Sequence, residues 1–153
     1  MLPAFNRSLN PVRALPEPGI REEESTLNIT VIFTSPESTI AALRKAGTLA
    51  ESLSARITLV VPQIVPYPLP LASPPVLLDF QEERFRAIAA RSPVDVTVQL
   101  YLCRDGTEIL RRVLKPHSLI VVGGRQRFWP TAPNRLARKL RQAGHEVIFA
   151  EDE

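Results

Sequence analysis

One segment of the sequence combines the residue types that bind anions. From residue 118 it reads SLIVVGGRQRFWPTAPNRLARKL. Gly123 and Gly124 end an apolar run and let backbone amides approach a ligand closely, while Arg125 and Arg127 add positive charge. A helix expected to begin near Asn134 offers unpaired N–H groups in its first turn. This combination predicts an anion site at the end of a buried strand.

Other candidate groups have a structural role at least as well suited to them. Cys103 precedes Arg104 and a predicted helix, which would lower its thiol pKa, but a buried apolar cysteine is the favoured interpretation. Ser35 suits a helix cap, since no base accompanies it. Phe128 and Trp129 could stack on a base or cover the sheet end, and the sequence favours neither.

The signatures of several enzyme classes are missing. The sequence contains neither G-x-x-x-x-G-K-[ST] nor G-x-G-x-x-G, which removes the phosphate-loop and dinucleotide-binding hypotheses. His117 and His145 each precede a predicted strand, away from the expected ligand end of the sheet. The single cysteine excludes an intrachain disulfide and a multi-thiolate metal site. We therefore expect no metal, no catalytic residue and no enzymatic activity.

The elements that must position these residues alternate regularly. Apolar periodicity predicts four helices, near residues 36–54, 78–92, 105–115 and 134–143, between five strands. The strands are expected at Leu27–Thr34, Arg56–Val61, Val94–Cys103, Ser118–Gly123 and Glu146–Ala150. Such alternation requires a parallel sheet with helices on both faces, which binds ligands beyond the carboxyl ends of its strands.

Two proline-rich segments fall outside this pattern. Residues 1–26 contain four prolines and an acidic cluster and are expected to be a flexible tail, ahead of one α/β domain at 27–153. Residues 62–75 contain six prolines and predict a stiff loop folded over the domain rather than a P-x-x-P ligand. In Val94–Cys103, apolar and polar residues alternate, which is typical of an edge strand with one wetter face.

Charge is distributed unevenly along the chain. Residues 104–141 hold ten basic and two acidic residues, a net charge of +8 that leaves −5 for the remainder. Such a stretch permits an anionic partner, but solvated helix faces are the favoured explanation. No apolar run is long enough to span a bilayer, and no secretory signal is evident, so the cytoplasm is the expected compartment.

From Leu27 to Glu151 the chain resembles the universal stress protein family. The resemblance rests on the order of elements, the long loop after the second strand, and the block IVVGGRQRFWPTAPNRLARKLRQAGHEVIFA. It implies an open five-stranded parallel sheet of order 3-2-1-4-5 with helices on both faces, similar to the adenine nucleotide alpha hydrolases. This order agrees with an edge position for Val94–Cys103.

The resemblance also implies an altered nucleotide site. In the family, V-V-G is followed by G-x-x-G, about nine residues and G-[S/T], which hold the phosphates of ATP. Gly124 stands for the first glycine, but Arg127 replaces the second, and Pro133-Asn134 replace the last pair. Thr34 stands where an aspartate usually contacts the nucleoside. ATP binding is therefore expected to be lost or weakened.

The leading hypothesis is a non-catalytic regulatory or stress-response module that dimerises through its last strand, Val147–Ala150. The alternative is a site for ATP, AMP or another adenine nucleotide, contacted by Thr34, Ser35, Val61, Cys103, Gly123, Gly124, Arg125, Arg127 and Asn134. An enzyme comes third. A fourth hypothesis is a basic surface on the last two helices that docks a membrane protein, such as a transporter, or a nucleic acid, which is the less favoured partner.

Overall fold

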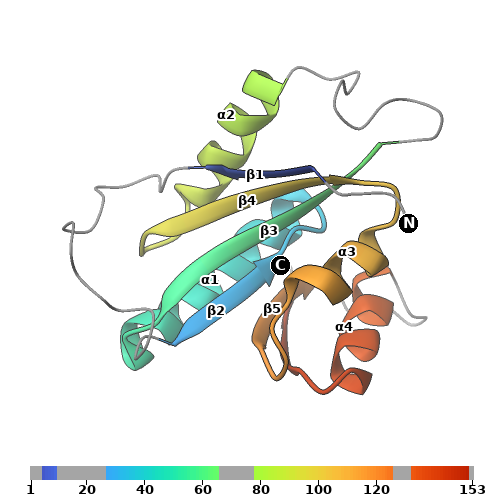
Figure 1. The fold of residues 1–153 in the computed structure, drawn as a ribbon. Coiled ribbons are helices and arrows are strands. Elements are labelled where there is room, and N and C mark those ends of the chain that lie inside the picture. The colour runs from blue at the N-terminus through green and yellow to red at the C-terminus, as the bar shows by residue number, and fades with distance from the viewer. Residues whose placement is uncertain (1–4, 10–26, 66–77, 126–131, 152–153) are drawn as a thin grey trace.

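The computed structural model describes residues 5–9, 27–65, 78–125 and 132–151. These residues form six strands and four helices (Figure 1). In chain order they are β1 (Phe5–Leu9), β2 (Asn28–Ile32), α1 (Pro36–Leu53), β3 (Arg56–Ile64), α2 (Leu78–Ala89), β4 (Val96–Cys103), α3 (Gly106–Val113), β5 (Leu119–Gly124), α4 (Ala132–Gln142) and β6 (Glu146–Glu151).

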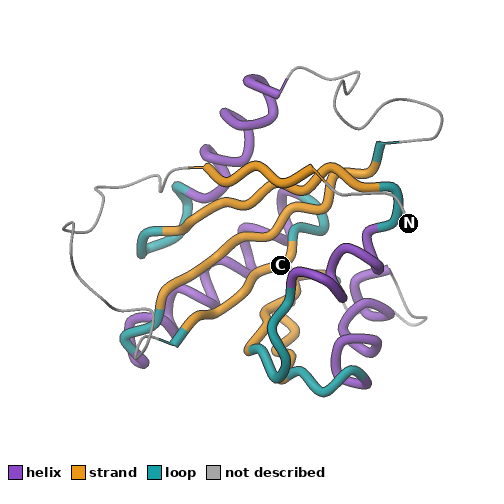
Figure 2. Tube along the Cα trace, viewed as in Figure 1, coloured by secondary structure: helices purple, strands orange, loops and turns teal. Residues whose placement is uncertain are grey.

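All six strands belong to one sheet of order β1-β4-β3-β2-β5-β6, in which β2 to β6 are parallel and β1 is antiparallel. Figure 2 shows the strands in orange and the helices in purple. Without β1, the order is that of the predicted 3-2-1-4-5 sheet, which is therefore confirmed. The strand ladder brings the carboxyl ends of β2 and β5 together at the centre of the sheet, where Ile32 pairs with Val122.

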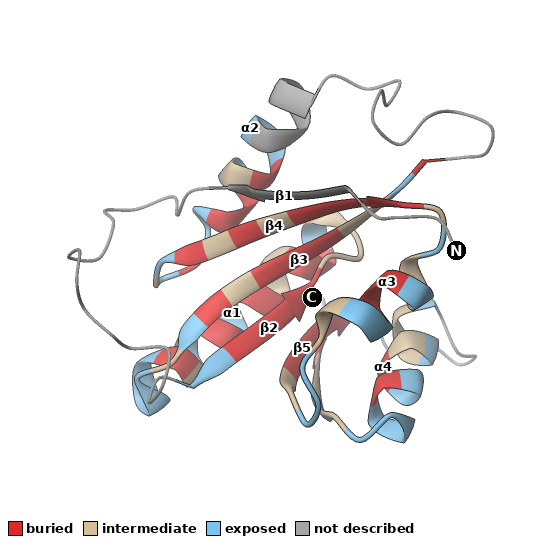
Figure 3. Ribbon diagram, in the orientation of Figure 1, coloured by how far each residue is buried: buried red, intermediate tan, exposed pale blue. Residues whose placement is uncertain are grey.

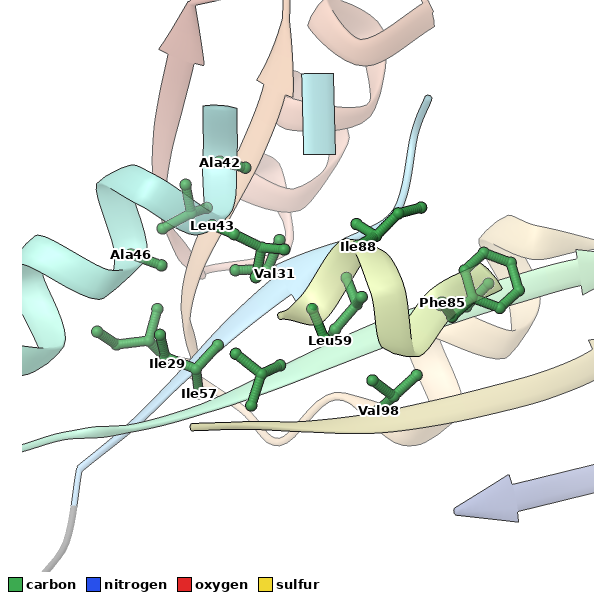
Figure 4. Close-up of a cluster of buried hydrophobic side chains, with 14 of the residues drawn as sticks. Ile29, Val31, Ala42, Leu43, Ala46, Ile57, Leu59, Phe85, Ile88 and Val98 are labelled. Carbon is green, nitrogen blue, oxygen red and sulfur yellow. The ribbon is translucent and has the colours of Figure 1, made fainter. Parts of the chain in front are cut away.

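Helices cover the two faces of the sheet separately. On one face, α1 and α2 enclose a core in which Leu43 and Phe85 pack over strand residues such as Val31 and Leu59 (Figure 4). On the other face, α3 and α4 pack over a second, smaller cluster, which includes Leu140. Buried residues concentrate on the strands and on the sides of the helices that face them (Figure 3).

Local sequence fixes the limits of the helix nearest the predicted site. Pro36 occupies the first turn of α1, where its missing N–H costs nothing, and the Ser35 hydroxyl accepts from the Ser38 N–H at 3.2 Å. Ser54 ends the helix in the left-handed conformation. The carboxyl end of β2 is thereby joined to a helix whose buried face is set by the spacing of its small and apolar residues, Ala42, Leu43, Ala46 and Ala50.

The strand β1 was not expected from the sequence. Phe5–Leu9 lies in the segment predicted to be a flexible tail, yet it pairs antiparallel with β4, Phe5 opposite Leu102 and Leu9 opposite Val98. The prediction that Val94–Cys103 forms an edge strand is wrong for the same reason, because β1 covers that edge. Residues 10–26 lie outside the described part of the chain, and the domain boundary at 26 stays a prediction.

Pro62 belongs to β3, although the sequence places it in the proline-rich loop. The Val60 carbonyl accepts from the Phe33 N–H on the β2 side, so residue 62, two positions on, also directs its backbone toward β2. Ladder pairing between β2 and β3 ends at Ile32 and Val60, so no β2 partner loses a hydrogen bond to the proline nitrogen. The strand continues along β4 to Ile64. The rest of the predicted loop, 66–75, is not described.

Candidate functional site

At the centre of the sheet, the predicted ligand end is held together by hydrogen bonds within the protein. The Thr34 hydroxyl donates to the Gly123 carbonyl at 3.0 Å, and the Thr34 N–H donates to the Thr39 hydroxyl at 3.1 Å. The Ser35 hydroxyl caps α1. The structure thus brings Thr34, Ser35 and Gly123 together as predicted, and it gives each polar side chain a structural partner.

The two glycines of the predicted anion site are packed against protein. A Cβ built on Gly123 would lie 1.9 Å from the Ser38 carbonyl oxygen, because α1 crosses β5 there. A Cβ on Gly124 would lie 2.7 Å from Pro133 Cβ and 2.9 Å from Phe149 Cζ. Real Cβ atoms are not found so close to other heavy atoms. Both positions therefore require glycine for the approach of α1, α4 and β6.

The start of α4 closes the site on its other side. The helix begins at Ala132, two residues before the predicted Asn134, with Pro133 in its first turn. Pro133 offers no N–H to a ligand, and its ring lies against Gly124. Asn134 is half-buried behind it, and Arg125 is exposed just after β5. Arg127 and the two aromatic residues Phe128 and Trp129 lie outside the described residues.

Val61 and Cys103 do not join this group. Val61 is 1% exposed and belongs to the core under α1 and α2. Cys103 pairs with Ile64, four residues beyond the last β3 residue that pairs with β2, so it lies far along the sheet from Gly123. Cys103 is thus placed away from the site, whereas Val61 lies level with Gly123 in the strand ladder and is separated from the site by its burial.

Cys103 is a buried thiol. Its side chain faces the α3 layer, and the sulfur donates to the Gln63 carbonyl at 3.8 Å. Burial, and then the negative charge of Asp105, raise the pKa of the Cys103 thiol above its ordinary value. The favoured interpretation of a buried apolar cysteine is correct, and the alternative of a low-pKa thiol is not. The neighbouring Arg104 donates through Nη1 to the Val65 carbonyl at 3.0 Å and ties the ends of β3 and β4 together.

The two histidines fasten the opposite, amino-terminal end of the sheet. The Ser118 N–H donates to His145 Nδ1 at 3.1 Å, and His117 Nδ1 is 3.1 Å from the Gly144 carbonyl oxygen. His117 has a φ of 57°, in the left-handed region. Within the described ranges, no group of three or more His, Cys, Asp or Glu side chains is placed to hold a metal ion. None of the described helices is long and apolar enough to cross a membrane.

Sequence reasoning missed a groove that lies over one face of the sheet. This groove has a volume of about 620 Å³ and lies at the amino-terminal half of the sheet, on the α3 side. Its floor includes Thr58, Thr97 and Gln99. The alternation of VTVQLYL predicts one wetter face of this strand, which is the sequence signal for the groove.

The fold has solved counterparts. The universal stress protein from Archaeoglobus fulgidus matches with a TM-score of 0.55 and 16% identity, covering 81% of this chain and 93% of its own. A universal stress protein in complex with cAMP matches with a TM-score of 0.51 and 13% identity, covering 83% of this chain and 98% of its own. No family model and no curated protein matches the sequence. With the strand order, these matches show that the chain has the universal stress protein fold.

Proposed function

We propose that this protein is a non-catalytic regulatory module of the universal stress protein type that has lost the ATP-binding glycine cradle. The proposal rests on the packing of Pro133 against Gly124. In the family pattern a Gly-[S/T] pair stands at this place and supplies backbone and hydroxyl donors to phosphate. Here the ring occupies the space beside the strand end, and residue 133 has no N–H to donate. The space beside Gly123 is likewise filled, by the backbone of α1.

An adenine-nucleotide site is the second candidate, because one structural neighbour is a complex with cAMP. Such a site would use Thr34 and Arg125 beside the Gly123-Gly124 strand end, together with Arg127. Thr34 already donates its hydroxyl to the Gly123 carbonyl and its N–H to the Thr39 hydroxyl, so a nucleotide would have to displace one of these bonds or donate to the Thr34 oxygens. The packing therefore favours the first candidate.

Thermal unfolding in millimolar Mg-ATP, ADP, AMP and cAMP separates the two candidates. A ligand selective for the native state raises the unfolding midpoint. We expect no shift with the wild-type protein. A clear rise with any of the four nucleotides would overturn the loss of the site and establish the second candidate.

A variant that restores the residue types of the family pattern, with five residues in place of about nine between its two parts, tests the physical reason. Arg127→Gly, Pro133→Gly and Asn134→Ser together rebuild G-x-x-G and the Gly-Ser pair. If the cradle failed only through these positions, the triple variant gains an ATP-dependent rise in midpoint that the wild type lacks. The matched control combines Arg127→Gly with Asn134→Ser and keeps Pro133, so it should show no such rise.

We further propose that the module works in the cytoplasm as a homodimer joined through β6. This strand pairs only with β5 within the described sheet, so its other edge has backbone groups available to a second strand. Val147, Ile148 and Phe149 are each half-buried in one chain. Sedimentation over a range of concentrations would reveal a dimer, and a monomer at all concentrations would remove this part of the proposal.

The exposed basic residues of α3 and α4 suit a protein partner with an acidic surface. The two helices α3 and α4 cover the same face, and their outward residues include Arg111, Arg112, Arg138, Lys139 and Arg141. Such a surface attracts negative charge, and binding to it should weaken steeply as salt increases.

A further inference from the structure

The groove on the α3 side exists because α3 is too short to cover the strands beneath it. Eight residues of helix extend about 12 Å, whereas the nine residues of β3 extend about 30 Å. Parallel sheets are normally covered on both faces. In Figure 1 no helix crosses the amino-terminal half of β2, β3 and β4 on the face that carries α3 and α4. The groove of about 620 Å³ occupies this uncovered area.

Polar side chains form the floor of the groove. Thr30, Thr58 and Thr97 make one row across three neighbouring strands, since Thr30 pairs with Thr58 and Thr58 with Thr97. The Thr58 hydroxyl donates to Asn28 Oδ1 at 3.0 Å. The Thr97 hydroxyl bonds to no other residue in the described part of the chain and is half-buried. A hydroxyl-lined floor of this kind suits a ligand that itself carries several hydroxyl groups.

Gln99 continues this floor toward the carboxyl end of β4. Its Oε1 atom accepts from the Tyr101 hydroxyl at 2.8 Å, which fixes the amide and directs its nitrogen away from that hydroxyl. Gln99 pairs with Val60 in the strand ladder, two residue pairs beyond the threonine row and on the same face of the sheet. The floor therefore offers hydroxyl groups and an amide donor over a short distance.

Two basic side chains line the groove. Arg56 lies at the amino end of β3, and Lys115 lies in the turn between α3 and β5, which also holds His117. None of the described residues that line the groove has a carboxylate. The His117 ring is fixed by its hydrogen bond with the Gly144 carbonyl. Cations at the rim of a polar floor favour a ligand with a negative group at one end.

We propose that this groove binds a small polyhydroxylated anion of the sugar phosphate class. The phosphate would lie against Lys115, and the hydroxyl groups of the sugar would bond to Thr58, Thr97 and Gln99. The volume is within the range of small-molecule sites in proteins. The groove lies at the opposite end of the strands from Gly123 and Gly124, so the proposal is independent of any nucleotide site at the sheet centre.

Amide and methyl NMR of the full chain tests the proposal, with glucose 6-phosphate, ribose 5-phosphate and glycerol 3-phosphate as probes at millimolar concentration. At least one should shift the resonances of Thr58, Thr97, Gln99 and Lys115 and leave those of Gly123 and Gly124 unchanged. It should bind at least tenfold more tightly than inorganic phosphate or glucose. Shifts with none of the three, shifts only near Gly123, or equal binding of inorganic phosphate would each overturn it.

Two variants and their matched controls locate the binding. Thr97→Val keeps a β-branched side chain and removes the free hydroxyl, and Lys115→Gln removes the charge at the rim. Each should weaken binding about tenfold, as loss of one such hydrogen bond or charged contact does. Thr48→Val and Lys139→Gln make the same changes on the exposed faces of α1 and α4 and should leave the affinity unchanged. Equal losses in the controls would overturn the assignment to the groove.

Discussion

Gly123 allows α1 to pack closely against β5. A side chain at this position would collide with the Ser38 carbonyl, which belongs to the helix backbone and cannot rotate away. We expect Gly123→Ala to lower the free energy of unfolding by about 3 kcal/mol or more, through overpacking. Urea unfolding followed by circular dichroism measures the loss.

Gly106 supplies the control for that experiment. A Cβ there would meet Ile64 Cδ1 at 3.6 Å and Pro62 Cβ at 3.7 Å, which are ordinary contact distances. Because alanine also forms helix more readily than glycine, Gly106→Ala should change stability by less than about 1 kcal/mol. A comparable loss in both variants would show that Gly123 has no special packing role.

Cys103 should react slowly and make the fold sensitive to alkali. Burial and Asp105 raise the pKa of the thiol in the folded protein above its ordinary value of 9.0. The unfolded thiol ionises first, so the free energy of unfolding should be constant below about pH 8 and fall as pH rises through 9. Urea unfolding at pH 8, 9 and 10 should show a steeper fall in the wild type than in Cys103→Ala.

Thiol titration with Ellman's reagent gives a second measurement of the same property. The native protein should react at least tenfold more slowly than the protein unfolded in urea, because the thiolate is the reactive form. Fast reaction in the native state would contradict the buried, neutral thiol.

At the scale of elements, a side chain of α4 protects the open edge of β6. Glu146 directs its N–H to Ser118 on β5, so Val147, the next residue, directs its carbonyl away from the sheet. Arg141 Nη2 donates to that carbonyl at 3.1 Å. The guanidinium thus occupies an acceptor that a second strand would use.

Arg141→Ala should therefore strengthen dimerisation, by about fivefold in the dissociation constant measured by sedimentation, since one competing hydrogen bond is removed. Arg138→Ala removes the same charge from the same helix and is the control. If both variants dimerise alike, or if neither differs from the wild type, Arg141 does not guard the edge.

The parallel sheet could be predicted because its elements have strong local signals. Asp105 caps α3 as its spacing to Glu108 predicts, with the carboxylate accepting from the Thr107 and Glu108 N–H groups. The strand β1 has no such signal, since it is held by pairing with a distant strand rather than by its own apolar pattern. The sequence places Pro62 in a loop because it does not show where β2 ends. A proline at this position of β3 is tolerated only because the pairing with β2 has already stopped, which is a property of strand register.

The candidate site could be predicted only in part, because the position of a residue in it also depends on strand register. Thr34 and Gly123 follow neighbouring central strands, and topology alone places them together. Cys103 also ends a strand, but β3 and β4 continue past the end of β2, which moves it away. The groove depends on the length of α3 relative to β3, and no motif in the sequence reports that comparison.

At the scale of the molecule, β1 shields the least protected strand. β4 reads VTVQLYLC, with neither a charge nor a proline to discourage pairing with another chain. Deletion of residues 1–10 should therefore cause self-association, seen as larger species in light scattering at concentrations where the full chain shows none. Replacing the strand with a Gly/Ser segment of equal length should do the same, while an unchanged size distribution would contradict the shielding role.

The antiparallel cover of β1 also limits what kind of assembly the sheet can form. With β4 covered, the two edge strands of the described sheet are β1 and β6. Two chains that join through identical β6 edges are related by a two-fold axis, and each then presents only its β1 side to the outside. The resulting twelve-stranded sheet would be closed to further growth through either β6 edge, so strand addition through β6 ends at two copies and does not propagate into a fibre.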